Sequence, residues 1–141
     1  MFQRVVICGV GLIGGSFALA LRKAGLVKQL VGMGRTRAPL ETALAQGVID
    51  VIATDWADAL AGADLVLLGM PVGQMLPVMQ AMQPHLPATT LVTDAGSTKG
   101  GVVAAARATS PCATCVVCAH TAVTDNTDKA TTTAALRAAW R

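Results

Sequence analysis

Residues 7–16, ICGVGLIGGS, place four glycines inside an apolar run that extends from Arg4 to Arg22. Gly9, Gly11 and Gly14 have the spacing G-x-G-x-x-G, which is typical of a strand-to-helix turn that binds a dinucleotide. The first glycine permits the tight turn, the second lets a pyrophosphate approach the backbone, and the third lets helix and strand pack closely. We therefore expect a phosphate to rest on the N-terminus of the helix that begins here.

A secretory or membrane segment is the alternative interpretation of this run. Arg4 precedes it, and residues 18–20, Ala-Leu-Ala, resemble a small-x-small cleavage site. That interpretation explains neither the glycine spacing nor the pattern farther along the chain. We favour the dinucleotide loop, in which Leu12 and Ile13 are further expected cofactor contacts.

The rest of the chain alternates β-type runs with helical runs. The predicted strands are residues 4–9, 29–34, 48–54, 64–70, 89–96 and 113–119, and the predicted helices are 14–25, 38–47, 55–63, 75–86 and 101–108. This alternation predicts an α/β fold, a doubly wound parallel sheet of about six strands. Pro77 is expected in the first turn of its helix, where a missing N–H is tolerated.

Composition limits the partners of this chain. Its 141 residues suffice for one domain, and its net charge of +3 is not gathered into Lys/Arg clusters. With two Trp, two Phe and no Tyr, it offers little for a nucleic acid to stack on. We expect a cytoplasmic protein with a small-molecule substrate and no nucleic-acid or membrane partner.

The second predicted strand indicates which cofactor is preferred. It ends in residues 32–37, GMGRTR, without the acid that usually holds the ribose hydroxyls of NAD. A guanidinium there can bind a 2′-phosphate, so Arg35, with Thr36 beside it, predicts NADP as the preferred cofactor and NAD as the second choice. Solvated loop arginines are the alternative interpretation.

The ends of the later predicted strands supply the remaining candidate residues. Met70 and Pro71 are expected to pass under the nicotinamide ribose. Ser97 follows the fifth strand and His120 the sixth, so both are expected at the edge where ligands bind in such sheets. There, one could orient the other around a substrate hydroxyl, although Ser97 could equally be a helix N-cap.

Taken together, these strings resemble the prephenate and arogenate dehydrogenases of tyrosine biosynthesis. The match extends from Arg4 to about Ala108 and includes GVGLIGGSFALALRKAG, GMGRTRAPLETALAQGVID, DLVLLGMPVG and TDAGSTKG. The resemblance implies a Rossmann domain that takes hydride from the hydroxyl-bearing ring carbon of prephenate, with loss of carbon dioxide. It also implies that His120 accepts a hydrogen bond from that hydroxyl and that Ser97 supports it.

The C-terminal part departs from this family. The Pro and Gly that follow the family's histidine are replaced by Thr121 and residues around Val123, and all fourteen glycines lie at or before Gly101. Family members dimerise through a helical C-terminal domain, which we expect to be missing from this truncated chain. We predict a dinucleotide-binding domain over residues 1–120 and a divergent tail over 121–141.

Three cysteines in the final third form C-x-x-C-x-x-C, namely Cys112, Cys115 and Cys118. A tetrahedral metal site needs a fourth ligand, and the run overlaps the predicted strand 113–119, so no metal is expected.

Two functional interpretations remain open. The chain is a prephenate or arogenate dehydrogenase, or it is a catalytically inactive Rossmann fragment that only binds NADP or NAD.

Overall fold

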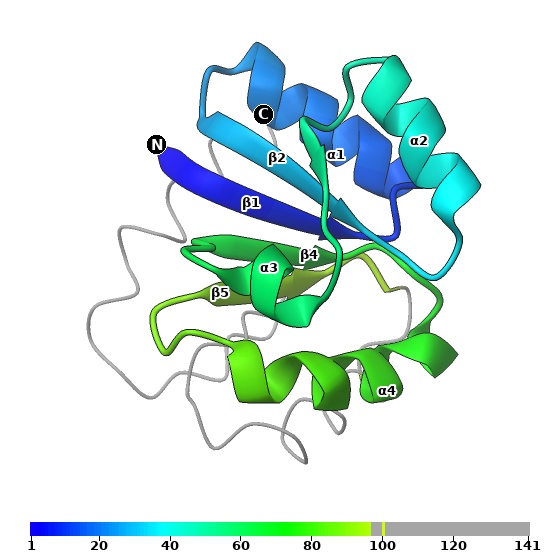
Figure 1. Ribbon diagram of the computed structural model, residues 1–141, viewed down its shortest axis with the longest axis vertical. Helices are drawn as coiled ribbons and strands as arrows, with labels where there is room; N and C mark the ends of the chain where they lie inside the picture. Colours follow the sequence, from blue (N-terminus) through cyan, green and yellow to red (C-terminus); the bar gives the residue numbers. More distant parts are fainter. Residues whose placement is uncertain (97–99, 101–141) are drawn as a thin grey trace.

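Five parallel strands form a sheet in the order β3-β2-β1-β4-β5 in the computed structural model, which describes residues 1–96 and residue 100 (Figure 1). The first half contains β1 (Phe2–Cys8), α1 (Leu12–Lys23), β2 (Val27–Met33), α2 (Arg37–Ala45) and β3 (Val51–Ile52). The second half contains α3 (Trp56–Leu60), β4 (Leu65–Leu68), α4 (Val72–Met82), the 3₁₀ turn η1 (Gln83–His85) and β5 (Leu91–Asp94). The predicted doubly wound α/β fold is confirmed.

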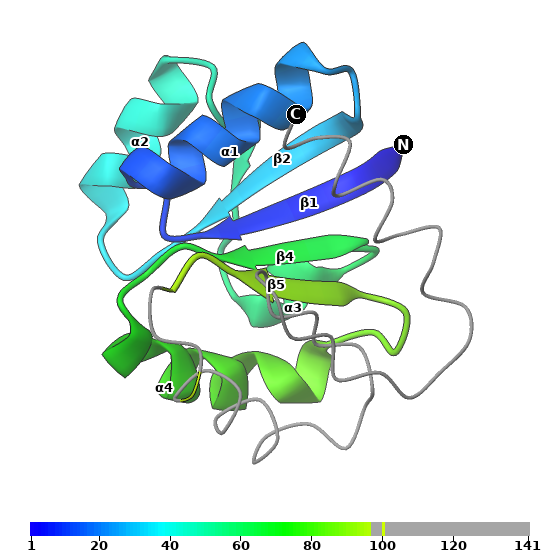
Figure 2. The same cartoon turned by 180° about the vertical axis from the view of Figure 1, so that it is seen from behind.

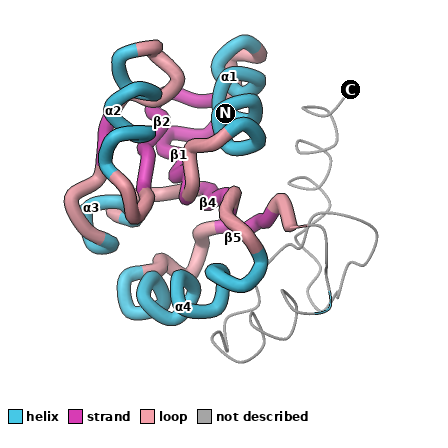
Figure 3. Tube along the Cα trace, turned by 90° about the vertical axis from the view of Figure 1, so that its right-hand side faces the viewer, coloured by secondary structure: helices cyan, strands magenta, loops and turns pink. Residues whose placement is uncertain are grey.

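Helices cover both faces of the sheet, so most strand positions are buried. In Figure 2, α1 lies in front of β2, and Figure 3 shows α1 and α2 on one side of the strands and α3 and α4 on the other. Alternate residues of β1 therefore enter two cores: Val5 and Ile7 pack toward α1, whereas Val6 and Cys8 pack toward α4. This explains why the strands read as continuous apolar runs.

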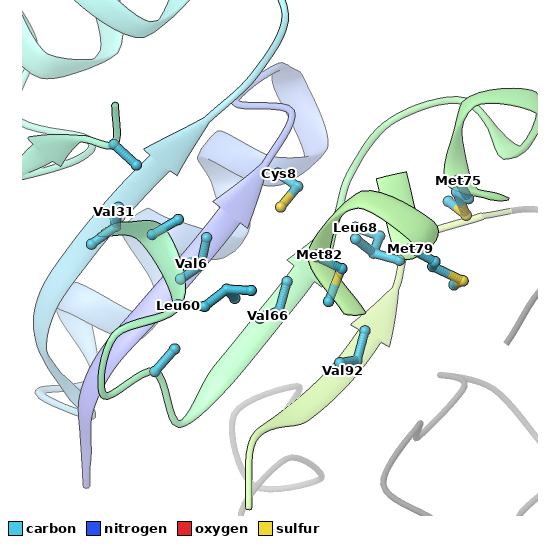
Figure 4. Packing of buried hydrophobic residues seen from close by; sticks show 13 residues of the cluster. Val6, Cys8, Val31, Leu60, Val66, Leu68, Met75, Met79, Met82 and Val92 are labelled. Atoms are coloured by element: carbon cyan, nitrogen blue, oxygen red, sulfur yellow. The ribbon is translucent and has the colours of Figure 1, made fainter. Parts of the chain in front are cut away.

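The core on the α4 side is rich in sulfur. Met75, Met79 and Met82 have helical i, i+4, i+7 spacing and bury one face of α4 against Val66, Leu68 and Val92 of the sheet (Figure 4).

None of the helices in the described part of the chain has the length and apolar character that crossing a bilayer requires.

The third strand is shorter than predicted. It is limited to Val51–Ile52, and at its start the amides of Val48 and Ile49 both donate to the carbonyl of Ala43 at the end of α2. Those amides close the helix and do not pair with β2.

The fourth helix begins earlier than predicted, at Val72 instead of Met75. Pro77 consequently lies in the second turn, and its expected place in the first turn was wrong. Pro77 gives the carbonyl of Gly73 no amide partner, but Gly73 is exposed and water can hydrate it. The predicted helix 101–108 and strand 113–119 lie outside the described residues.

Candidate functional site

Four turns lie side by side at the carboxyl edge of the sheet, because the ladder of hydrogen bonds continues past the ends of the strands. The first residue after a strand donates its N–H to the last residue of the neighbouring strand at three places: Gly9 to Met33 (2.8 Å), Gly69 to Cys8 (2.7 Å) and Ala95 to Leu68 (3.0 Å). The turns that follow β2, β1, β4 and β5 are therefore held in register with one another.

The turn after β1 requires glycine for two separate reasons. Gly9 has a φ of +85°, which L side chains rarely adopt. A Cβ there would also lie 3.1 Å from the backbone carbon of Gly69, in the turn after β4. Gly9 thus permits both the tight turn and the close approach of a segment sixty residues away.

Gly14 and Gly11 differ in the space around them. A Cβ on Gly14 would overlap the carbonyl oxygen of Gly9 and come within 2.9 Å of Cγ2 of Ile7, which confirms the close helix–strand packing predicted for the third glycine. A Cβ on Gly11 would meet no atom within 4 Å. The loop is closed toward the sheet and open on its outer side, where a ligand can approach the backbone.

The N-terminus of α1 has the character of an anion site. Its N-cap, Gly11, forms no side-chain cap bond, and the first turn contains no acid. The first helical bond runs from the N–H of Gly15 to the carbonyl of Gly11 (2.8 Å), so the amides of residues 12–14 have no acceptor within the helix. Leu12 and Ile13, which carry two of these amides, are 88% and 55% exposed. Free amides and the helix dipole together favour a phosphate.

Two arginine side chains that differ in their ion pairing follow β2. Arg37 pairs with Glu41 one helical turn later (Nε to Oε1, 3.0 Å). Arg35 and Thr36 are exposed, and within the described part of the chain the Arg35 side chain forms no ion pair. No carboxylate is present at the end of β2, which ends at Met33 and is followed by Gly34. Arg35 is therefore the cation best placed to meet an incoming anion at this turn.

The turn after β4 contains Met70 and Pro71. Met70 is half-buried and packs on the sulfur-rich core, whereas Pro71 is exposed and forms the N-cap of α4. The predicted cofactor residues from the turns after β1, β2 and β4 thus share one edge. Ser97 and His120 lie outside the described residues, so their expected meeting stays a prediction.

Two residues at this edge were not among the predicted site residues. Gly69 closes against the glycine loop, since a Cβ there would lie 2.9 Å from the carbonyl oxygen of Gly9. Asp94 ends β5 in a buried position, and its Oδ1 accepts the N–H of Gly96 (2.8 Å). An acid at the end of the predicted strand, in the run LVTD, was the available signal for Asp94.

Cys8 lies beneath the glycine loop, where β1 ends. Its side chain is enclosed by the core on the α4 side (Figure 4), and this burial raises the pKa of the thiol from 9.0 to about 12. Desolvation disfavours the thiolate, so Cys8 has the character of an inert core residue and not of a nucleophile.

The shifted pKa of Cys8 predicts a pH dependence of stability. Below about pH 9 the thiol is protonated in both the folded and unfolded states; between about pH 9 and 12 only the unfolded state ionises. The free energy of unfolding should fall by about 1.4 kcal/mol per pH unit across that window through this group. Urea titrations of the parent and Cys8→Ala at several pH values would measure it, because other titrations cancel in the difference. Parallel pH profiles for the two proteins would contradict the assignment.

Comparisons with known proteins point to one family. The model of the family described as "Prephenate dehydrogenase, nucleotide-binding domain" matches residues 17–134. The chain is 35% identical over 104 residues to prephenate dehydrogenase of Bacillus subtilis, covering 73% of this chain and 28% of that protein. It is 36% identical over 104 residues to cyclohexadienyl dehydrogenase of Zymomonas mobilis, covering 73% of this chain and 35% of that protein. The chain thus spans about a third of the length of these curated relatives.

Solved structures agree with this result. Prephenate dehydrogenase from Aquifex aeolicus, in complex with hydroxyphenyl propionate and NAD⁺, matches with a TM-score of 0.76 and 29% identity over 89% of this chain and 44% of that one. Arogenate dehydrogenase from Synechocystis matches with a TM-score of 0.68 and 31% identity over 74% of this chain and 37% of that one.

Proposed function

The chain belongs to the family of prephenate dehydrogenase nucleotide-binding domains, and from this premise we propose that it binds NADP or NAD and serves the oxidative decarboxylation of prephenate or arogenate. The observation that carries the proposal is the glycine loop. It is closed toward the sheet at Gly14, open at Gly11, and continuous with the uncapped N-terminus of α1. A pyrophosphate fits such a loop because backbone amides reach its oxygens without an intervening side chain.

In the proposed reaction, a bound NADP or NAD would supply the nicotinamide as electron acceptor for a hydride from the hydroxyl-bearing ring carbon of the substrate. The ring carboxylate leaves as carbon dioxide, and its bonding electrons make the ring aromatic. The products are a reduced cofactor, carbon dioxide, and 4-hydroxyphenylpyruvate from prephenate or tyrosine from arogenate. We assign His120 to accept the hydrogen bond of the substrate hydroxyl and Ser97 to support His120. The proposed domain covers residues 1–120, followed by the tail 121–141.

Two measurements on the purified chain test this function separately. Calorimetric titration with NADP and NAD measures binding, and absorbance of the reduced nicotinamide measures turnover with prephenate or arogenate. We expect binding of a cofactor and its reduction in the presence of one of the two substrates. Binding without reduction would identify the chain as a cofactor-binding fragment, and failure to bind either cofactor would contradict the proposal.

We further propose that NADP is the preferred cofactor and that Arg35 reads its 2′-phosphate. A carboxylate at the end of β2 would repel that phosphate, and none is present. Arg35 has an exposed side chain free of ion pairs to described residues, whereas Arg37 is engaged by Glu41. The two arginines therefore form a matched pair for mutagenesis.

Arg35→Ala is expected to lower the affinity for NADP by about ten- to a hundredfold, because one charge-assisted contact to phosphate contributes roughly 1.5–3 kcal/mol. The affinity for NAD should change little, and added salt should narrow the difference between the cofactors in the parent. Arg37→Ala is the control and should keep the parental ratio of affinities. Equal affinities in the parent, or an unchanged ratio in Arg35→Ala, would rule out Arg35 as the phosphate-reading residue.

A further inference from the structure

Asp94, the last residue of β5, places a carboxylate inside the protein at the edge proposed to bind the cofactor. It is 4% exposed and lies in register with Leu68 of β4, a member of the sulfur-rich core. Burial of a carboxylate is unfavourable unless hydrogen bonds compensate for lost water. Its presence at the end of a buried strand therefore points to a contact that stabilises it.

One such contact is with the turn that follows β5. Oδ1 of Asp94 accepts the N–H of Gly96 at 2.8 Å, and the preceding amide, of Ala95, donates to the carbonyl of Leu68 at 3.0 Å. Two consecutive amides are thus tied down, one to the neighbouring strand and one to the Asp94 side chain. The direction in which the chain leaves β5 is fixed by this pair of bonds.

Packing at Gly96 confines the same turn from the other side. A Cβ on Gly96 would lie 3.0 Å from Oδ1 of Asp94, 3.0 Å from Cγ2 of Val72 and 3.3 Å from Cε of Met75. Val72 and Met75 belong to the first turn of α4, which begins directly after the Met70–Pro71 segment. Asp94 therefore holds the turn after β5 against the helix that follows the turn after β4.

We propose that Asp94 is a positioning residue, which acts through its hydrogen bond to Gly96 to orient the chain as it leaves the sheet. The inference rests on the proposed function, because the next residue in the sequence is Ser97, to which that function assigns a role at the substrate hydroxyl. A carboxylate oxygen suits this task because it is a stronger acceptor for a backbone N–H than a neutral group.

Two substitutions at Asp94 separate the hydrogen bond from the charge. Asp94→Ala removes the acceptor and should raise the exchange rate of the Gly96 amide, measured by NMR, by about tenfold or more. It should also lower kcat by about tenfold or more, while the dissociation constant for the cofactor stays within about threefold. Asp94→Asn keeps an oxygen acceptor, so it should retain slow exchange at Gly96 and recover most of the lost kcat.

Thr90→Val is the matched control at the opposite end of β5. Thr90 is also buried, and its hydroxyl donates to the carbonyl of Ala63 at 2.6 Å, so the variant should lower the melting temperature without changing kcat or exchange at Gly96. Parental exchange at Gly96 in Asp94→Ala would overturn the proposal, as would an Asp94→Asn variant as impaired as Asp94→Ala. If the parent binds a cofactor but turns over neither substrate, the catalytic part of the proposed function fails, and exchange at Gly96 still decides whether Asp94 orients the turn.

Discussion

Gly14→Ala is expected to destabilise the folded protein and abolish measurable cofactor binding at concentrations that saturate the parent. The added methyl group would overlap the carbonyl oxygen of Gly9 and crowd Ile7 at 2.9 Å. A backbone oxygen cannot rotate away as a flexible side chain can, so α1 or the loop must shift. Overpacking of this kind costs about 1–3 kcal/mol or more, a large part of typical domain stability. Urea denaturation measures the first effect and calorimetric titration the second.

Gly15→Ala is the control for this substitution, one residue farther along the same helix. A Cβ on Gly15 would meet Cγ1 of Val48 at 3.7 Å, which is ordinary van der Waals contact. Alanine in place of a helical glycine should raise the free energy of unfolding by about 0.5–1 kcal/mol. Adjacent glycines are thus expected to respond with opposite signs. Equal stability of the two variants would mean that α1 does not pack on the loop as described.

His120→Asn is expected to lower turnover by about 10²–10⁴-fold with little effect on cofactor affinity, provided that the parent chain is active with prephenate or arogenate. Asparagine keeps a hydrogen-bonding side chain but cannot act as a base near neutral pH. Steady-state kinetics of reduced-nicotinamide formation would give the turnover, and calorimetry would give the affinity. His85→Asn serves as the control, because His85 is exposed in η1 and should tolerate the change. Unchanged turnover in His120→Asn would remove His120 from the mechanism.

The strands could be predicted from the sequence because each is a short apolar run enclosed by helices on both faces. The predictions for 4–9, 29–34, 64–70 and 89–96 each contain most of an observed strand. Two details could not be predicted from hydrophobic periodicity, which shows neither the acceptor that a backbone amide takes nor the residue at which a helix begins. The amides of Val48 and Ile49 close α2 in preference to pairing with β2, and α4 starts early enough to place Pro77 in its second turn.

The part of the candidate site formed by the glycine loop could be predicted, because the spacing of its glycines is typical of one backbone conformation. The positive φ of Gly9 and the tight packing of Gly14 follow from the G-x-G-x-x-G pattern. Gly69 was missed because its importance lies in a contact between turns that are far apart in sequence. Asp94 was missed because the burial of its carboxylate follows from the fold, although its hydrogen bond to Gly96 is local. A single glycine after β4 resembles any loop glycine until the neighbouring turn is seen.

The hydrogen bonds that join the turns after β2, β1, β4 and β5 have a thermodynamic consequence for any ligand that binds there. Ordering a flexible loop during association carries an entropic penalty, which lowers affinity for the same set of contacts. Here the amides of Gly9 and Gly69 are already immobilised by the sheet before a ligand arrives. A phosphate that binds at this edge should therefore pay only a small entropic penalty for ordering the turns, and most of the energy of its contacts should contribute to affinity.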